Sequence, residues 1–386
     1  MGINTTGKDI WHTDFEKTFR QRTQEGWASF LAGEAKLRQY VDENRDSEEI
    51  ISVCTELLEP AFYDVAFEVG FNGEKHELIL TPDGSKAKLF PLLYFKNYAP
   101  EEVLEHWNIL IGRQPAKSEA FVLKMYGVDV SGEDIFIWAK RESDTVKLTV
   151  YCEKILPLLK EDEDKAYWFM YVMLDEIIGE IASMRYIDGL ELVTEPLAGE
   201  SMILNQLPEY LSSTFTEQDG DIQDAAGYIN RYTCYEMQPA KEEDMAVRRD
   251  VYVGVTNCVP IINEYLHDEN YAIDNFYHDG IEAGFFCYPL NSFTGENRGK
   301  EILDFRDSIE SAVLKQAGEE AVTFIGGASG VYYGYLDFIA WDIDAVFQAA
   351  SDIFEETSLE WVEFYSFKKD AACVVLKEEN EIPSCH

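Results

Sequence analysis

The chain has 386 residues with 73 acidic and 32 basic side chains, which gives a formal net charge of −41. Its residues are 46% hydrophobic and 13% aromatic, which excludes a disordered acidic tail and predicts packed cores. Because one hydrophobic core rarely serves a chain of this length, two domains are the starting expectation.

The acidic excess extends along the whole chain. Residues 1–200 hold 38 acids and 21 bases, a difference of −17, and residues 201–386 hold 35 acids and 11 bases, a difference of −24. Nucleic acid and anionic membrane surfaces attract proteins through Lys and Arg, so we expect neither as a partner. Solubility is one sufficient reason for the charge, and the alternatives are a surface for a basic protein or the binding of cations.

Cysteine usage and hydropathy indicate a cytoplasmic protein. The seven cysteines are scattered without any C-x-x-C pair, which is typical of reduced thiols. No apolar run approaches the roughly 18 residues of a membrane span. The N-terminal residues also lack the apolar segment of a signal peptide.

The first half of the chain is predicted to mix helices with hairpins. Apolar residues at helix spacing predict helices within 11–59, the second of them opening at Ser47. The almost wholly apolar stretch 165–181 predicts a helix buried on most sides. One further helix is expected at 86–98, and strands are expected at 63–69, 76–81, 134–141 and 145–152.

A domain boundary is predicted near the middle of the chain. The stretch 196–226 carries Pro, Gly, Ser and acids without clear periodicity. We therefore expect an N-terminal domain at 1–200, an acidic linker at 201–226 and a C-terminal domain at 227–386.

The second half is predicted to be rich in strands. Helices are expected at 259–267, 300–316 and 343–354, and strands at 228–235, 250–256, 284–290, 321–325, 331–340, 359–367 and 371–376. Strands and helices do not alternate as regular βαβ units. The expected fold class is therefore α+β, with a mostly antiparallel or mixed sheet and packed helices in each domain.

The strongest candidate site lies at a strand-to-helix transition, in the segment YLDFIAWDID. Grouped carboxylates can bind a hard cation or act as an acid–base pair. Asp342 or Asp344 could equally cap the helix that starts near Ile343. The candidate binding residues are Asp337, Trp341, Asp342 and Asp344.

Three other patterns lack the spacing that their chemistry needs. The glycine cluster 326–330 (GGASG) has neither the Lys-Ser/Thr of a P-loop nor a G-x-S-x-G elbow, and is interpreted as a connection between strands. Asp219-Gly220-Asp221 lacks the remaining ligands of an EF-hand. His267 and His278 are eleven residues apart, with no H-E-x-x-H motif. No metal site, cofactor or catalytic motif is predicted.

Aromatic residues gather at 167–172, 331–335 and 361–367. Core packing explains most such residues. An exposed cluster would mark an interface, where Tyr and Trp are favoured anchors.

Two segments of the first half carry a resemblance. Residues 76–114 (HELILTPDGSKAKLFPLLYFKNYAP…HWNILIGRQ) resemble the "ELVISADG"-type segment of an uncharacterised bacterial two-domain protein family. In this first segment Gly112-Arg113 replaces the family's usual aromatic residue before Arg. YVMLDEIIGEI with YIDGLELV, within 165–194, is similar to that family's "LLD…LGE…ID" segment. The resemblance implies a bacterial, non-secreted protein of two α+β modules and implies no activity.

The acidic charge without assembled chemistry favours a non-enzymatic binding protein, for instance an immunity-type inhibitor of a basic protein. Carboxylates would raise the association rate, and aromatic anchors would supply most of the affinity. The alternative is a hydrolase or cation-dependent enzyme with its site around Asp337, Asp342 and residues 326–330. A scaffolding role through self-association is the third hypothesis.

Overall fold

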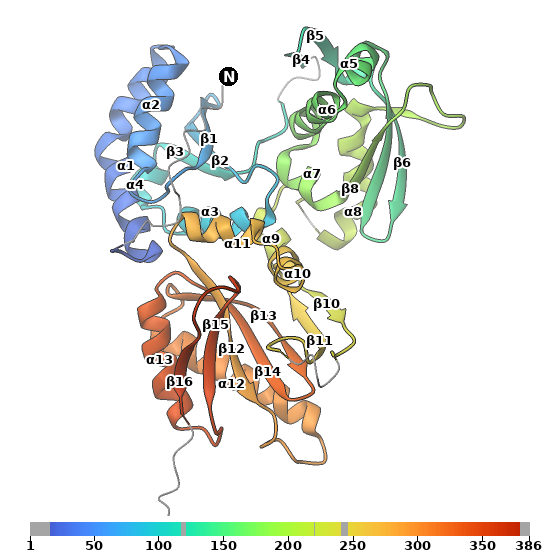
Figure 1. Cartoon of the computed structure of the whole chain (residues 1–386). Coiled ribbons are helices and arrows are strands. Elements are labelled where there is room, and N and C mark those ends of the chain that lie inside the picture. Colours follow the sequence, from blue (N-terminus) through green and yellow to red (C-terminus); the bar gives the residue numbers. More distant parts are fainter. Residues whose placement is uncertain (1–15, 117–120, 220, 241–245, 379–386) are drawn as a thin grey trace, which may run out of the picture. The chain divides into compact units, whose positions relative to one another are not determined.

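A computed structural model describes residues 16–116, 121–219, 221–240 and 246–378, with the backbone alone at 216–219 (Figure 1). The fold is α+β, as the sequence predicts. Contacts divide the chain into two compact units. Unit 1 comprises Met1–Val65, Tyr98–Val103 and Arg231–His386, and unit 2 comprises Ala66–Asn97 and Leu104–Asn230.

Unit 1 contains one antiparallel sheet in the strand order β10-β11-β13-β14-β12-β15-β16. Its strands are β10 (Thr233–Glu236), β11 (Val251–Thr256), β12 (Glu282–Pro289), β13 (Val322–Gly330), β14 (Tyr333–Ala340), β15 (Val362–Ser366) and β16 (Val374–Lys377). Its helices are α1 (Phe19–Asp42), α2 (Ser47–Leu58), α10 (Val259–His267), α11 (Tyr271–His278), α12 (Arg298–Ala317) and α13 (Ile343–Glu355).

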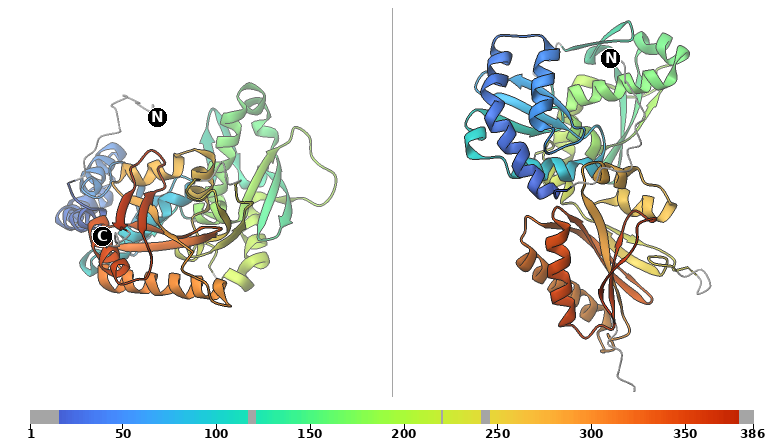
Figure 2. Two further views of the ribbon diagram at one scale, coloured as in Figure 1. Left: turned by 60° about the horizontal axis from the view of Figure 1, so that its bottom comes forward. Right: turned by 60° about the vertical axis from the view of Figure 1, so that its left-hand side comes forward.

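The two faces of this sheet are covered differently, because successive side chains of a strand point to opposite sides. Phe286, Phe338 and Phe364 belong to a buried core shared with α12 and α13, which lie together on one face (Figure 2). The neighbouring residue Phe285 points to the other face, where Tyr265 of α10 packs edge-on against it at 5.6 Å between ring centroids.

Helix α1 belongs to unit 1 although it is distant in sequence from the sheet. Thr18 caps the helix in a reciprocal capping box with Gln21. The Arg20 amide donates to the Trp341 carbonyl at 2.9 Å, and the Phe19 ring lies 5.7 Å from the Trp341 ring. The helices expected within 11–59 are confirmed from Phe19 onward, and residues 11–15 lie outside the described residues.

Unit 2 contains three small sheets, ordered β1-β2-β3, β4-β5 and β8-β7-β6-β9. The strands are β1 (Ala66–Phe71), β2 (His76–Thr81), β3 (Trp107–Ile111), β4 (Val122–Met125), β5 (Val128–Ser131), β6 (Phe136–Glu142), β7 (Thr145–Tyr151), β8 (Ile187–Leu192) and β9 (Met202–Ile203). The helices are α3 (Lys86–Asn97), α5 (Leu156–Glu161), α6 (Glu163–Ile178), α7 (Glu180–Tyr186), α8 (Leu207–Asp219) and α9 (Ala225–Ile229), and the short α4 (Glu101–Leu104) lies where the chain passes between units.

Both predicted hairpins of the first half are confirmed as β1–β2 and β6–β7. Strands β2 and β3 run parallel, with α3 as the crossover between them. The carboxyl ends of β2 and β3 therefore lie at the same edge of their sheet.

Residues 201–226, expected to be a linker, fold instead as part of unit 2. Leu207, Leu211 and Phe215 of α8 are fully buried in the core formed with the β6–β7 hairpin and α6. Their spacing of four residues places them on one side of a helix, and that pattern is obscured by the polar residues between them. The division into units also differs from the expected 1–200 and 227–386, because α1 and α2 group with the C-terminal sheet.

The glycine cluster 326–330 lies inside β13 rather than in a connection between strands. Gly326 has φ +138°, and a Cβ there would lie 2.0 Å from the Val255 carbonyl oxygen. A Cβ on Gly330 would lie 2.0 Å from a carboxylate oxygen of Asp250. Glycine is therefore needed for close approach within the sheet.

Two further expectations are corrected. The predicted strand 228–235 is reduced to β10, because residues 225–229 form α9. The predicted helix 165–181 is interrupted at Gly179, which separates α6 from α7. Within the described residues, no helix is both long enough and apolar enough to cross a membrane.

Candidate functional site

The candidate functional site is a pocket of about 330 Å³ in unit 2, bordered by one side of α6. Trp168, Tyr171 and Asp175 follow one another at spacings of three and four residues, so they share one face of the helix. Trp168 is 56% exposed and Tyr171 is 44% exposed. Large aromatic side chains and a carboxylate are thus accessible on the same helical face.

The end of α6 brings a second carboxylate to the pocket. Gly179 has φ +83° and ψ 147°, a conformation almost confined to glycine, and it separates α6 from α7. The Gln223 side chain donates to the Ile178 carbonyl and occupies the space that a Cβ on Gly179 would need. This turn places Glu180 at the first position of α7, beside Asp175.

Glu180 joins α7 to the adjacent carboxyl ends of β2 and β3. It is 1% exposed, and its carboxylate accepts from the Gly84 amide at 3.1 Å and from the Arg113 amide at 3.0 Å. The Glu180 amide in turn donates to the Arg113 carbonyl at 2.9 Å. These backbone bonds hold the wall of the pocket in a fixed geometry.

Arg113 is the central cation of the pocket. Its guanidinium lies 3.1 Å from Glu68, 3.6 Å from Asp83 and 3.7 Å from Asp175. The distance to Asp175 exceeds that of a normal hydrogen bond, so the pairing with Asp175 is weak. A second cation, Lys86, lies over the Tyr228 ring at 4.6 Å.

Two carboxylates of the pocket, those of Asp175 and Glu180, hold protons more tightly than usual. Burial, followed by the charge of Glu180, raises the pKa of Asp175 to about 7, and a hydrogen bond from Ser183 and the charge of Arg113 act in the opposite direction. Burial also raises the pKa of Glu180. Near neutral pH the site can therefore release a proton when a cation binds beside Asp175.

The predicted site residue Asp337 lies elsewhere, in the sheet of unit 1. It is fully buried and forms a bidentate ion pair with Arg248, at 2.5 Å to Nη1 and 3.2 Å to Nη2. The Arg248 guanidinium also donates to the Tyr235 hydroxyl at 3.0 Å and lies 4.7 Å from the Phe285 ring centroid. Asp337 thus balances an internal charge.

The other predicted residues surround the start of α13. Asp342 caps this helix by accepting from the Ala345 amide at 3.2 Å, and it lies 3.5 Å from Arg20. Asp344 lies in the first turn of the helix. Trp341 is 2% exposed and donates through Nε1 to the Thr323 hydroxyl at 2.9 Å. The structure brings these three residues together but places Asp337 in a separate network.

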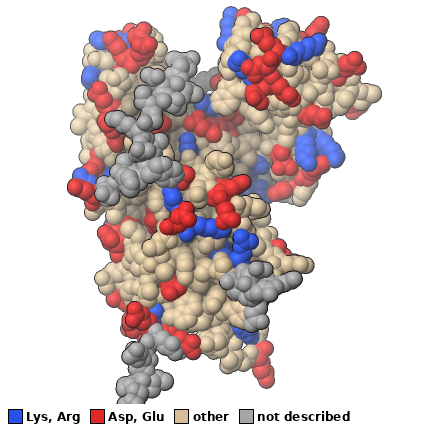
Figure 3. All heavy atoms as spheres, in the orientation of Figure 1, with Lys and Arg blue, Asp and Glu red and all other residues tan. Residues whose placement is uncertain are grey.

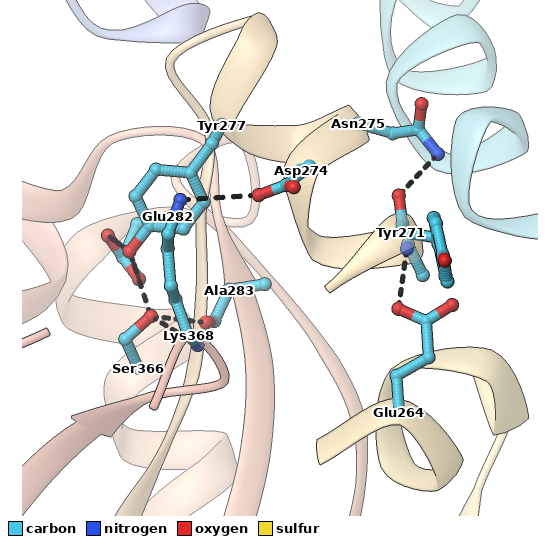
Figure 4. Close-up of polar contacts among 10 residues, drawn as sticks. Glu264, Tyr271, Asp274, Asn275, Tyr277, Glu282, Ala283, Ser366 and Lys368 are labelled. Carbon is cyan, nitrogen blue, oxygen red and sulfur yellow. Dashed lines mark hydrogen bonds and ion pairs between the residues drawn. The ribbon is translucent and has the colours of Figure 1, made fainter. Parts of the chain in front are cut away.

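Trp341 also borders a smaller cavity of about 200 Å³, next to a group of polar side chains (Figure 4). The Tyr277 hydroxyl lies within 3.1 Å of both Glu282 oxygens and 2.8 Å from the Ser366 hydroxyl. Lys368 lies 3.2 Å from Asp274. Burial raises the pKa of Tyr277 and Glu282. The groups of this cluster bind one another, so it serves to fix α11 at the end of the sheet.

The remaining sequence candidates form no site. His267 Nδ1 lies 2.7 Å from the Asn263 carbonyl, and His278 packs against Tyr63 at 5.8 Å. Asp221 accepts from the Gln223 amide in a turn, and Gly220 lies outside the described residues. No group of three His, Cys, Asp or Glu side chains in the described part of the chain is placed to hold a metal ion.

The residues that make the α6 pocket were not singled out by the sequence. The apolar stretch around 167–172 predicts that its aromatic residues lie mostly in the core. A usable signal was the placement of Trp168 and Tyr171 on the same helical face as Asp175, since a core-facing stripe would not carry a carboxylate. Arg113 is brought to the pocket by β3 and carries no comparable signal.

Comparison with known proteins adds no assignment. The chain matches no protein-family model, no curated protein and no solved structure. The resemblance at residues 76–114 and 165–194 therefore gains no support, and the pocket geometry is the basis for a functional proposal.

Proposed function

We propose that the chain is a cytoplasmic, non-enzymatic binding protein for a basic partner protein, of the immunity-inhibitor type, and that the α6 pocket is its docking site. The observation that supports this proposal is the coincidence of two exposed aromatic side chains, Trp168 and Tyr171, with the partly exposed carboxylate of Asp175 on one face of α6. Aromatic anchors contribute most of the affinity at protein interfaces, and charge complementarity mainly increases the association rate.

The pocket offers a basic side chain two kinds of contact. A Lys or Arg of the partner can lie over the Trp168 or Tyr171 ring in a cation–π interaction. Its charge can also approach Asp175, whose side chain is 17% exposed and lies 3.7 Å from Arg113. The incoming cation would thus give Asp175 a closer counter-charge than Arg113 provides.

The alternative, a hydrolase or cation-dependent enzyme centred on Asp337 and Asp342, has less support. Such chemistry needs carboxylates that can reach a substrate or metal. Asp337 is fully buried against Arg248, and Asp342 accepts from the first turn of α13. The geometry therefore favours binding over hydrolysis at this location.

The proposal is tested by titrating the protein with an arginine-rich peptide and following tryptophan fluorescence at low and high salt. Any chain of this charge attracts a basic peptide, so the decisive comparison is between variants. We expect Trp168→Ala and Asp175→Asn each to weaken binding by roughly tenfold, as expected for interface anchors. Tyr271→Ala is the matched control, because Tyr271 is 77% exposed in unit 1. Equal binding by all three variants would contradict the proposal.

A further inference from the structure

A second pocket lies in unit 1, on the face of the sheet opposite α12 and α13. Its volume is about 400 Å³, within the range of small-molecule sites. Its lining includes Cys287 of β12, Tyr333 of β14, and Glu363 and Tyr365 of β15. Trp361, which directly precedes β15, also lines the pocket. Three aromatic rings and one carboxylate therefore surround the same space.

The alternation of the segment WVEFYSF builds this arrangement. Val362 and Phe364 are buried in the core shared with α13, so Trp361, Glu363 and Tyr365 point to the opposite face. The aromatic cluster at 361–367 thus divides between a core and a pocket.

Sheet register brings the neighbouring strands into the same pocket. Cys287 is paired with Glu363 on one side and with Tyr335 on the other. Tyr333 lies two residues before Tyr335 on β14 and therefore points to the same face. The Tyr333 amide donates to Asp250 at 2.9 Å, which fixes this end of β14.

The aromatic rings of this pocket are held in place by contacts within the protein itself. The Tyr333 and Trp361 rings meet at 5.5 Å with an angle of 62° between their planes. Tyr365 stacks on Phe285 at 5.8 Å and 14°. The Tyr365 hydroxyl donates to the Glu363 carboxylate at 2.6 Å, and this bond orients the carboxylate. A preorganised pocket loses little conformational entropy on binding.

Glu363 is the one charged side chain among the described residues that line the pocket. No Lys or Arg is among the described residues that line it. Burial raises the pKa of the Cys287 thiol well above its ordinary value, and the charges of Asp250 and Glu363 add to this effect, so the thiol stays neutral. Burial also raises the pKa of Tyr333 and of Tyr365. Glu363 is thus the charged group that a ligand would meet.

We propose that this pocket binds an organic cation through a methylated ammonium group, with the rings of Tyr333, Trp361 and Tyr365 around the methyl groups and Glu363 balancing the charge. The electron-rich faces of aromatic rings attract such cations. A quaternary ammonium has no N–H donor, so it needs no acceptor beyond Glu363, which is already engaged by Tyr365. The group could belong to a free small molecule such as choline or to a trimethylated lysine of a partner chain.

Calorimetric titration of the full chain tests this proposal with three probes. They are choline, its uncharged isostere in which a tert-butyl group replaces the trimethylammonium group, and a peptide with trimethyllysine compared with the same peptide unmodified. We expect the cation to bind at least about tenfold more tightly than its isostere, as a desolvated cation–π site requires. Binding by choline alone indicates a small molecule, and preference for the methylated peptide indicates a partner chain. Equal affinity for choline and its isostere, or no binding of either cation, would overturn the proposal.

Substitutions of the lining residues test whether choline binds in this pocket. Trp361→Ala should weaken choline binding by about tenfold or more, and Trp361→Phe, which keeps a ring, should weaken it less. Glu363→Gln should weaken binding of choline and leave binding of the isostere unchanged. Tyr271→Ala is the control and should have no effect, because Tyr271 is exposed in unit 1 and does not line this pocket. Circular dichroism checks that each variant is folded, and unchanged choline binding by folded Trp361→Phe and Glu363→Gln variants would refute the location.

Discussion

At the scale of single residues, the ion pair of Arg248 and Asp337 shows why a carboxylate in a promising sequence context need not be functional. The pair is almost fully buried, with side-chain exposures of 2% and 0%. The guanidinium is further enclosed by Phe285, Tyr335 and Phe367. A buried pair of this kind is costly to separate, because the remaining charge has no solvent.

We therefore predict that Asp337→Asn destabilises the protein by about 3–5 kcal/mol, because Arg248 is left buried without a counter-charge. Asp342→Ala is the matched comparison. It removes a helix cap and should cost only about 1 kcal/mol. The free energies of unfolding are measured by urea denaturation, and similar costs for the two variants would contradict the assignment of Asp337 to a buried ion pair.

Asp175 gives a pH dependence with a definite sign. Its pKa is raised to about 7 in the folded protein, against about 3.9 in an unfolded chain. The folded state therefore binds the proton more tightly, and this group lowers stability progressively as the pH rises from about 4 to about 7. Below that window both states are protonated, and above it the whole destabilisation is present.

The variant Asp175→Asn should therefore be more stable than the wild type at pH 8, by on the order of 1–4 kcal/mol, and this advantage should fall to about a third of that value at pH 5 and vanish below about pH 4. Urea denaturation at the two pH values measures this difference. Asp129→Asn, which removes the same charge from an exposed side chain, corrects for the change in net charge. A difference that is the same at pH 5 and pH 8 would show that Asp175 does not titrate in this window.

At the scale of elements, the turn at Gly179 determines the geometry of the α6 pocket. Gly179→Ala should destabilise the protein by about 1–3 kcal/mol from backbone strain alone, and the clash with Gln223 adds to this. Gly127→Ala is the control, since Gly127 has φ +78° but open space around its Cβ position. Urea denaturation should show the larger loss for Gly179→Ala, and equal losses would argue against a close approach at this turn.

The elements that could be predicted from the sequence are those whose signal is local. The hairpin at Asn72-Gly73 and the helix opening at Ser47 follow from turn and capping residues. The grouping of α1 with the C-terminal sheet depends on contacts such as the bond from Arg20 to Trp341, between residues more than 300 positions apart. Nothing in the local pattern reports a contact of that range.

The candidate site was hidden for the same reason. Its helix was predicted, but the pocket requires the end of β3 with Arg113, the turn at Gly84 and the helix break at Gly179. These segments meet only through tertiary pairing. Asp342, by contrast, was recognised as a possible helix cap from its position alone, and the structure confirms that role.

At the scale of the whole molecule, the charge of −41 alone does not identify a binding site. On the face drawn in Figure 3, acidic side chains form several separate groups with basic side chains between them. Charge of this kind keeps the protein soluble and attracts cations without selecting a location. Selection of a partner needs a place where acids and accessible aromatic residues coincide, and the α6 pocket provides one.

Hydrogen exchange with and without a bound arginine-rich peptide locates the docking site directly. We expect protection to concentrate on α6, α7 and the turns at Gly84 and Arg113, and we expect Trp168→Ala to abolish this local protection while general attraction persists. Protection spread evenly over the acidic surface, or confined to segments outside unit 2, would contradict the claim that this pocket is the docking site.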